Sequence, residues 1–199
     1  MITVVHTKKS GRVHKCTKHK DMCMLIMRMS YNDLSKNGGE AKLHVYGLGT
    51  FPVFSGRQPY TNDPNCTYIE NSAIPVGRYW VVDRPRGSLA NQVRSWVLDQ
   101  YTGNDHSDWL ALFSAQTMSD SMFVNKIARG SFRLHPLRPD GRGYSEGCIT
   151  FVSRLEFYKV RRFILGMKLI RVPGARSTLM TYGFVDVQGE SKFEKCIAR

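Results

Sequence analysis

The sequence predicts a mainly β protein with one or two short helices. Three observations support this class: apolar residues alternate with polar ones over short runs from residue 41 onward, turn-forming residues separate the runs, and only two stretches have a helical period. The chain has 199 residues, of which 42% are hydrophobic, enough for a buried core without added cross-links. The longest apolar run, 22–27, has six residues, whereas a membrane-spanning helix needs about 20. We therefore expect no membrane span.

Short alternating runs bounded by Gly, Pro, Asn or Asp mark the expected strands. These are residues 43–46, 49–55, 77–83, 109–114, 131–135, 148–152, 168–172 and 182–187. Segments 56–75 and 136–147 have little apolar periodicity and are expected to be loops. Because long loops in a compact domain are usually functional, both are candidates for a site.

The two expected helices cover residues 88–100 and 153–165. The second has Ser153 at the capping position and Glu156 three residues later, which is the capping-box spacing. We expect its buried face to contain Leu155, Val160, Phe163 and Ile164. The three tryptophans are expected in the core: Trp80, Trp96 and Trp109.

The basic charge is concentrated at the N-terminus. The formal net charge is +13, and residues 1–28 contain seven Lys or Arg and one Asp. We interpret 1–28 as a basic arm that is disordered or results from an upstream start site, and 29–199 as one catalytic domain. The arm has too short an apolar core and no small-residue cleavage site for a Sec signal.

A second basic cluster lies in residues 154–176, and either cluster could contact a polyanion such as nucleic acid or a carboxylate-rich cell wall. Charge alone does not choose the partner. Because no nucleic-acid-binding motif is present, a basic nucleic-acid-binding module is the weaker alternative and no nucleic-acid partner is expected.

The chain has five cysteines, an odd number, so it is not a disulfide scaffold. Cys66 and Cys196 either pair with each other or remain free thiols, and the sequence leaves both open. In the arm, His14, Cys16, His19 and Cys23 match no standard zinc spacing. We expect neither a metal nor an organic cofactor.

The candidate chemistry lies in segment 132–151. An expected strand ends at His135, a polar loop follows, and Cys148 begins the next apolar run, so that strand, loop and strand can bring Cys148 back near His135. A thiol is a weak nucleophile at its free pKa of about 8.5, and an imidazole can take its proton or hold it as an ion pair. A thiol and an imidazole are the two groups that a covalent acyl-transfer site of this kind needs.

The residues just before Cys148 fit the same role. Gly147 allows a tight turn that presents the backbone amides of Gly147 and Cys148 to a developing oxyanion. Ser145 can form a hydrogen bond across the turn or contact substrate.

The segment Ser145-Glu-Gly-Cys148, preceded by His135 on a strand, resembles the signature of L,D-transpeptidase catalytic domains. Three further landmarks support the resemblance: Ile74-Pro-Val-Gly-Arg-Tyr79, Asp83-Arg-Pro85 and Tyr46-Gly-Leu-Gly-Thr-Phe-Pro-Val-Phe-Ser-Gly56. The set is most similar to the L,D-transpeptidase-like effectors of bacterial type VI secretion, over roughly residues 29–172. The resemblance implies an L,D-transpeptidase-like β-sandwich or barrel.

The resemblance also implies a function on peptidoglycan stem peptides. Such enzymes cut a tetrapeptide between meso-diaminopimelate and the terminal D-Ala, as L,D-carboxypeptidases, or exchange that D-Ala, as L,D-transpeptidases. Cys148 matches the nucleophile, His135 the base, Gly147 the preceding glycine and Ser145 the motif serine. The family orients its His through a backbone carbonyl, and Asp140 is an alternative orienting group.

Two features depart from housekeeping members. Many housekeeping members carry an Arg two residues after the Cys, whereas this chain has Thr150 there. Arg133, on the strand face of His135, is the candidate replacement for binding a substrate carboxylate.

No secretion signal or wall-binding domain is visible. The effector reading implies synthesis in the cytoplasm, injection into a neighbour's periplasm, a type VI secretion carrier and a cognate immunity protein. Another Cys-His peptidase or amidase of the cell wall is the alternative enzyme.

Overall fold

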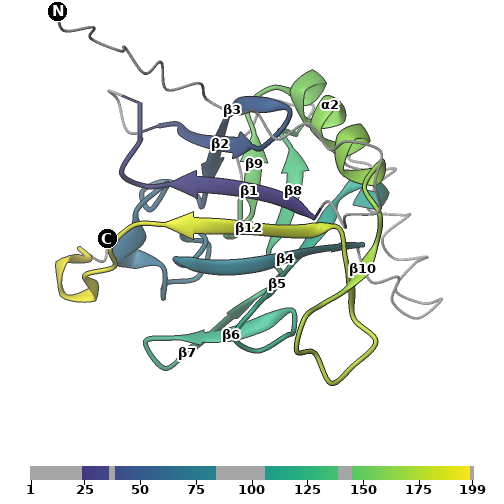
Figure 1. Cartoon of the computed structure of the whole chain (residues 1–199). Helices are drawn as coiled ribbons and strands as arrows, with labels where there is room; N and C mark the ends of the chain where they lie inside the picture. The colour runs from purple at the N-terminus through teal and green to yellow at the C-terminus, as the bar shows by residue number, and fades with distance from the viewer. Residues whose placement is uncertain (1–23, 36–38, 84–105, 139–144, 198–199) are drawn as a thin grey trace, which may run out of the picture.

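The computed structural model describes residues 24–35, 39–83, 106–138 and 145–197. Within them, eight strands form a closed barrel in the order β1-β12-β4-β5-β8-β9-β3-β2 (Figure 1). Their bounds are β1 (Leu25–Ser30), β2 (Ala41–Val45), β3 (Gly49–Ser55), β4 (Gly77–Asp83), β5 (Leu110–Ser114), β8 (Arg133–Pro136), β9 (Ile149–Phe151) and β12 (Gly183–Gln188).

Smaller elements lie outside the barrel. Helix α2 (Arg154–Leu165) follows β9, and the chain also forms the hairpin β6 (Ser121–Val124) with β7 (Ile127–Gly130) and the pair β10 (Ile170–Arg171) with β11 (Met180–Thr181). Short 3-10 turns lie at Pro64–Cys66, His106–Asp108 and Phe193–Lys195. The expected mainly β class, with a barrel and few helices, is confirmed. The helix expected at 88–100 and Trp96 lie outside the described residues.

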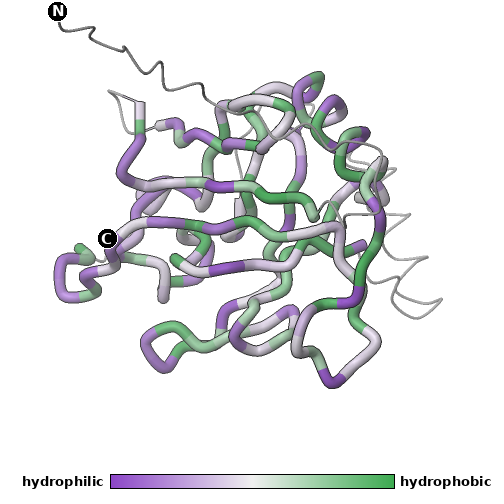
Figure 2. Tube along the Cα trace, viewed as in Figure 1, coloured by the Kyte–Doolittle hydropathy of each residue, from purple (hydrophilic) through white to green (hydrophobic). Residues whose placement is uncertain are grey.

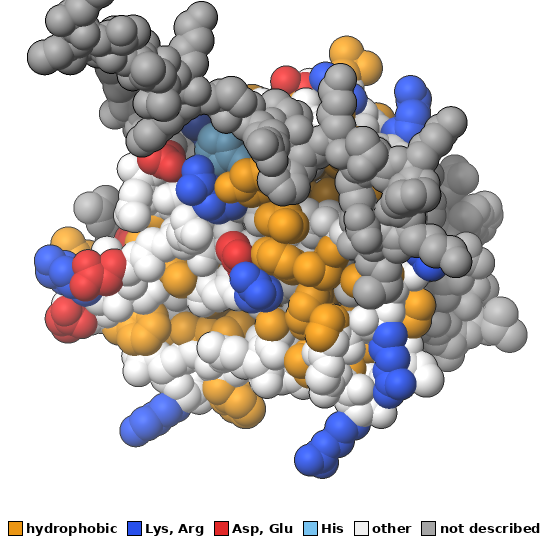
Figure 3. All heavy atoms as spheres, in the orientation of Figure 1, with side chains coloured by type: hydrophobic (Ala, Val, Ile, Leu, Met, Phe, Trp, Pro, Cys, Tyr) orange, Lys and Arg blue, Asp and Glu red, His pale blue; other side chains and the backbone are white. Residues whose placement is uncertain are grey.

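Strand periodicity explains how the barrel fills its interior. Figure 2 shows hydrophobic and hydrophilic residues following one another along the strands, and the apolar members point inward. Met27, Leu43, Val81 and Val185 are fully buried in this core. A second cluster forms around Trp80 and Phe184, and Figure 3 shows hydrophobic side chains gathered over β12 and β4. No helix in the described part of the chain is long and apolar enough to cross a membrane.

The folded region begins before residue 29, so the expected boundary of the arm is wrong for residues 25–28. Strand β1 starts at Leu25, runs parallel to β12 and antiparallel to β2, and buries Leu25 and Met27. The sequence does not show the alternation of apolar and polar residues in β1, because the outward-pointing Ile26 is also apolar. Ile26 is 41% exposed. Residues 1–23 lie outside the described residues.

Helix α2 begins as its sequence predicts. The Ser153 hydroxyl accepts a hydrogen bond from the Glu156 backbone amide, which caps the first turn. Of its expected buried face, Val160 and Ile164 are buried and Phe163 is partly buried against the core. Leu155 is wrong, since it is 84% exposed, and Phe157 is buried in addition. The face follows the 3.6-residue period from Phe157, so Leu155 falls on the opposite side.

Candidate active site

His135 lies on strand β8, and Cys148 lies just before β9, the strand that pairs with β8. The two strands are parallel, with His135 opposite Thr150 and Leu134 opposite Ile149. Cys148 directly precedes β9 and lies two residues before Thr150, the residue paired with His135. The strand–loop–strand return expected from the sequence is therefore present in the fold.

Both ring nitrogens of His135 contact oxygen atoms. Nδ1 lies 2.8 Å from the carbonyl oxygen of Pro136, and Nε2 lies 3.2 Å from the hydroxyl oxygen of Thr150. A carbonyl only accepts, so Nδ1 carries the proton and Nε2 of the neutral ring accepts from Thr150. The backbone carbonyl thus orients the imidazole. Asp140, the alternative orienting group, lies outside the described residues.

Trp109 stacks on the imidazole instead of entering the core. The ring centroids of Trp109 and His135 are 4.2 Å apart and their planes differ by 16°. Trp109 directly precedes β5, which pairs with β8. The indole fixes the plane of the imidazole, and its π face favours a positively charged ring. The sequence contained no local signal for this contact, because it joins separate strands.

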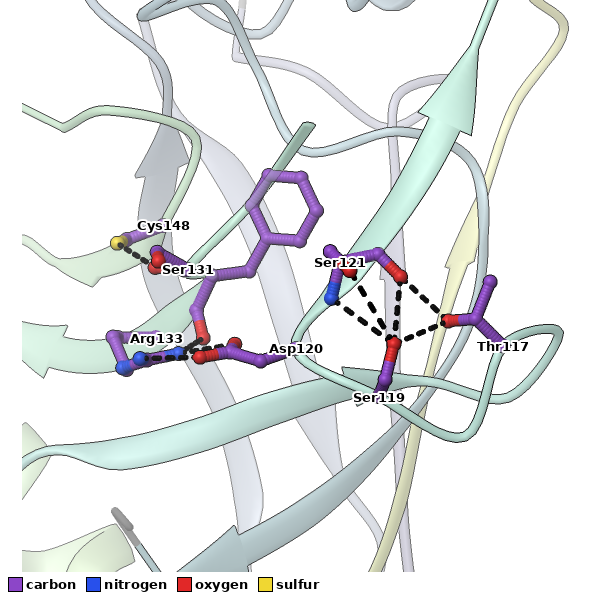
Figure 4. A network of polar contacts seen from close by, with 8 residues as sticks. Thr117, Ser119, Asp120, Ser121, Ser131, Arg133 and Cys148 are labelled. Carbon is purple, nitrogen blue, oxygen red and sulfur yellow. Dashed lines mark hydrogen bonds and ion pairs between the residues drawn. The ribbon is translucent and has the colours of Figure 1, made fainter. Parts of the chain in front are cut away.

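The Cys148 thiol is held in a buried site. Its Sγ donates to the carbonyl oxygen of Ser131 at 3.9 Å, and the residue is 6% exposed (Figure 4). Burial raises the pKa of the Cys148 thiol to about 11, although the backbone amide and positive charge of Arg133 oppose the rise. The resting residue is therefore a protonated thiol at neutral pH, and a base is needed to activate it.

The Ser131 carbonyl is aimed by an unusual backbone conformation. Ser131 has φ +58°, in the left-handed region that favours glycine, and its amide donates to the Asp120 carbonyl at 2.9 Å. Such conformations persist where neighbouring contacts hold them, and they occur often at functional sites. Here the turn between β7 and β8 directs a carbonyl at the thiol.

Arg133 is paired within the protein. Its guanidinium makes two hydrogen bonds to the Asp120 carboxylate, at 2.6 and 2.7 Å. Asp120 lies in a segment stabilised by hydroxyl contacts among Thr117, Ser119 and Ser121 (Figure 4). Arg133 thus affects the Cys148 thiol through its backbone amide and its charge, and a substrate carboxylate would compete with Asp120 for its guanidinium.

The turn before Cys148 requires glycine. Gly147 has φ +99°, and a Cβ there would lie 2.7 Å from Nη2 of Arg129 and 2.8 Å from Cε1 of Phe132. Ser145 is 1% exposed, and its hydroxyl donates to the Cys148 carbonyl at 2.8 Å. Of the two roles expected for Ser145, the hydrogen bond across the turn is present.

Behind this turn lies the buried guanidinium of Arg129, which the sequence analysis missed. It donates to the carbonyls of Thr67, Ile69 and Ser72 and to the Ser72 hydroxyl, with the Ile69 contact at 2.6 Å. Burial lowers the pKa of Arg129. Arg129 thereby connects loop 56–75 to the turn formed by residues 145–148.

The disulfide Cys66–Cys196 holds the same loop next to its contacts with Arg129. Cys66 directly precedes Thr67, whose carbonyl binds Arg129, and Cys196 lies just after the last 3-10 turn. The pairing left open by the sequence is thus present, and Cys148 is the free cysteine among the described residues.

No group of three His, Cys, Asp or Glu side chains suited to a metal ion occurs in residues 24–35, 39–83, 106–138 and 145–197. The arm residues His14, Cys16, His19 and Cys23 lie outside those ranges.

A model of a known protein family matches this part of the chain. The model of the Tlde1 domain matches residues 49–175, a range that includes β3, both strands of the candidate site and α2. The chain belongs to the Tlde1 domain family. This is a family of type VI secretion effectors with an L,D-transpeptidase-like domain, and membership supports an effector that is delivered into target cells and acts on peptidoglycan. No curated protein matches the chain.

Proposed function

We propose that this Tlde1 domain protein is a cysteine acyl-transfer enzyme that removes or exchanges the terminal D-Ala of peptidoglycan tetrapeptide stems. In this proposal Cys148 is the nucleophile and His135 is the base. The single observation that carries it is the arrangement of His135. Its Nδ1 lies 2.8 Å from the Pro136 carbonyl oxygen, and its Nε2 lies 3.2 Å from the hydroxyl of Thr150 on β9, two residues after Cys148.

The first half-reaction forms a thioester. The thiol leaves the Ser131 carbonyl, its proton passes to Nε2 of His135, and the thiolate attacks the carbonyl carbon at the L-centre of diaminopimelate. The amides of Gly147 and Cys148 stabilise the oxyanion. The imidazolium then gives its proton to the departing amine, the C–N bond breaks, and D-Ala leaves.

The second half-reaction regenerates the thiol. His135 takes a proton from water or from the amine of another D-amino acid, and that nucleophile attacks the thioester carbonyl. Collapse of the intermediate breaks the C–S bond, and the sulfur recovers its proton from the imidazolium. Water gives carboxypeptidase products, whereas the amine gives exchange. Neither half-reaction uses a cofactor.

The resting thiol favours a general-base mechanism over a permanent ion pair. With the pKa of Cys148 raised to about 11, little thiolate exists at neutral pH. Stacking on Trp109 assists by stabilising the imidazolium that forms when the proton moves.

Family membership supports a proposal for the cellular setting. We propose that the protein acts in the periplasm of a target cell, is delivered by a type VI secretion carrier, and is neutralised in its producer by an immunity protein. The substrate-binding roles of Arg133 and Ser145 remain part of the proposal. For Arg133 this role requires exchange of Asp120 for a substrate carboxylate.

The test compares purified wild type with Cys148→Ala on tetrapeptide muropeptides, with and without a free D-amino acid. Mass spectrometry is expected to show loss of one Ala without the amino acid and replacement of it in its presence. We expect Cys148→Ala to be folded and inactive, with a loss of several orders of magnitude.

Other products would change the assignment. Release of a dipeptide or cleavage of a cross-link would indicate a different Cys-His peptidase or amidase. Trimming by a folded Cys148→Ala variant would contradict the proposed nucleophile.

A further inference from the structure

Asp120 contacts segment 131–133 through two different groups. The residue directly precedes β6, at the base of the β6–β7 hairpin. Its backbone carbonyl accepts a hydrogen bond from the Ser131 amide at 2.9 Å. Its carboxylate accepts from both terminal nitrogens of Arg133, at 2.6 and 2.7 Å (Figure 4). One residue therefore holds both ends of a three-residue segment.

Segment 131–133 provides two backbone groups that act on the Cys148 sulfur. The Ser131 carbonyl accepts from Sγ at 3.9 Å, and this contact suits the protonated thiol. The Arg133 backbone amide lowers the pKa of the thiol, because it stabilises the thiolate. The position of this segment therefore affects both forms of the sulfur.

The chain packs closely where Asp120 meets the segment. A Cβ at Gly130 would collide with the Asp120 carbonyl oxygen, so glycine is needed at this point. Ser131 follows with φ +58° and donates its amide to that oxygen. The Asp120 carbonyl thereby fixes the backbone turn that directs the Ser131 carbonyl at Cys148.

The ion pair of Arg133 and Asp120 also balances charge at the sulfur. Burial is the main cause of the raised pKa of the Cys148 thiol, and the Arg133 charge opposes the rise. The charges of Glu146 and Asp120 add to the rise. Arg129, on β7, carries a further positive charge that interacts with the sulfur. The paired side chains are 14% and 32% exposed, so solvent screens their charges only in part.

We infer that Asp120 is a positioning residue for Cys148: its backbone directs the Ser131 carbonyl at the thiol, and its carboxylate offsets the Arg133 charge. Loss of the Asp120 charge leaves Arg133 unopposed, which favours the thiolate. Loss of the Arg133 charge leaves Asp120 unopposed, which favours the thiol. The inference rests on the proposed function, because it takes Cys148 as the nucleophile.

The test measures the rate of Cys148 labelling at pH 8 with neutral iodoacetamide and with negatively charged iodoacetate. The variants are Asp120→Asn, Arg133→Gln and the two combined. Asp186→Asn is the matched control, because Asp186 forms the same kind of doubly hydrogen-bonded pair with Arg78. That pair joins β12 to β4 and involves neither β8 nor β9. Peptide mass spectrometry gives the rate constants.

We expect the two single variants to change labelling in opposite directions. Asp120→Asn keeps an oxygen that can accept from Arg133 but loses the negative charge, so iodoacetamide labelling should become roughly three- to tenfold faster. Arg133→Gln should make it slower by a similar factor. The combined variant should return to within about twofold of wild type, since both charges are gone. Asp186→Asn should label as wild type does.

The ratio of iodoacetate to iodoacetamide labelling separates charge from access. A less negative site attracts the charged reagent, so the ratio should rise in Asp120→Asn and fall in Arg133→Gln. Local loosening would instead speed both reagents equally in both single variants. Because the ratio in Asp120→Asn is decisive alone, the test stands even if Arg133→Gln does not fold.

Two results would overturn the inference: labelling of Asp120→Asn at the wild-type rate, or a faster rate with an unchanged ratio of the two reagents. Failure of the proposed function looks different. Wild type would then release no D-Ala from tetrapeptides, whatever the labelling rates.

Discussion

The thiol of Cys148 is protected in the resting protein. It is buried, it donates to the Ser131 carbonyl, and its pKa is raised to about 11. A thiol kept in this form reacts slowly with adventitious electrophiles, and it becomes reactive only when a base takes its proton. The same residue therefore combines low resting reactivity with a nearby group that can activate it.

The first prediction concerns the pH dependence of alkylation. Because burial raises the pKa, the thiolate fraction is small at pH 7 and grows about tenfold per pH unit until it levels off near pH 11. Iodoacetamide labelling of Cys148, followed by peptide mass spectrometry, should show this slope in wild type. Fast labelling at pH 7 that levels off well below pH 9 would instead indicate a thiolate–imidazolium pair.

The second prediction concerns the indole that stacks on His135. Replacing Trp109 with Leu removes the π face that favours the imidazolium, so kcat should fall roughly tenfold in assays of D-Ala release. Trp109→Phe retains a stacked ring and should keep most of the activity. If the Leu and Phe variants have equal kcat, the stacked ring does not assist the reaction.

Residue type alone was enough to propose part of the candidate site. Cys148, His135 and Gly147 stand out because thiol, imidazole and glycine at that spacing have a specific chemical use. Trp109 and Arg129 do not, because their roles depend on contacts between strands and loops far apart in the sequence. Arg133 was predicted to bind a substrate carboxylate from the strand face of His135, and its pairing with Asp120 was not visible in the sequence.

At the scale of the element, the turn 145–148 depends on the absence of a side chain at its third position. Gly147 combines a positive φ with close approach by Arg129 and Phe132. These two constraints are independent. The backbone conformation penalises any L residue, whereas the approach penalises added volume.

The third prediction separates these constraints with two alanine variants. Gly147→Ala should cost at least ~2 kcal/mol in the free energy of unfolding and lower turnover about a hundredfold, because it strains the backbone and displaces the nucleophile. Gly174→Ala, at φ +76° with nothing within 4 Å, should cost about 1–2 kcal/mol and leave turnover unchanged. Urea unfolding and D-Ala release measure both. A Gly147→Ala variant as active as Gly174→Ala would contradict this account of the turn.

Element boundaries show where local sequence is informative. Ser153 and Glu156 predicted the start of α2, since capping depends on residues three apart. Which face of α2 is buried depends on the barrel beneath it, and the prediction at Leu155 failed for that reason. Likewise, β1 is recognisable as a strand only through its pairing with β2 and β12.

At the scale of the whole molecule, a disulfide and the turn 145–148 are linked through contacts of Arg129. Cys66–Cys196 holds the start of the segment whose carbonyls bind Arg129, and Arg129 packs behind Gly147. Loss of this cross-link therefore affects both global stability and the support of the active-site turn.

The fourth prediction tests this connection. Cys66→Ser combined with Cys196→Ser should lower the free energy of unfolding by about 2–5 kcal/mol, since the bridge spans 130 residues. It should also lower turnover at temperatures where circular dichroism shows a fully folded protein, because the Arg129 carbonyl ligands are less well held. Reductant should reproduce both effects in wild type and change nothing further in the double variant. Unchanged turnover in the folded double variant would show that the bridge stabilises the fold only.

The parallel pairing of β1 with β12 has a consequence for synthesis on the ribosome. Leu25 to Ser30 emerge early, yet their partner, Gly183 to Gln188, emerges last among the barrel strands. Until then the nascent sheet has two open edges, at β1 and β4, which both border β12. A translation product that stops before residue 183 cannot close the barrel, so we expect quality-control proteases to remove it before it accumulates as a partly folded toxin.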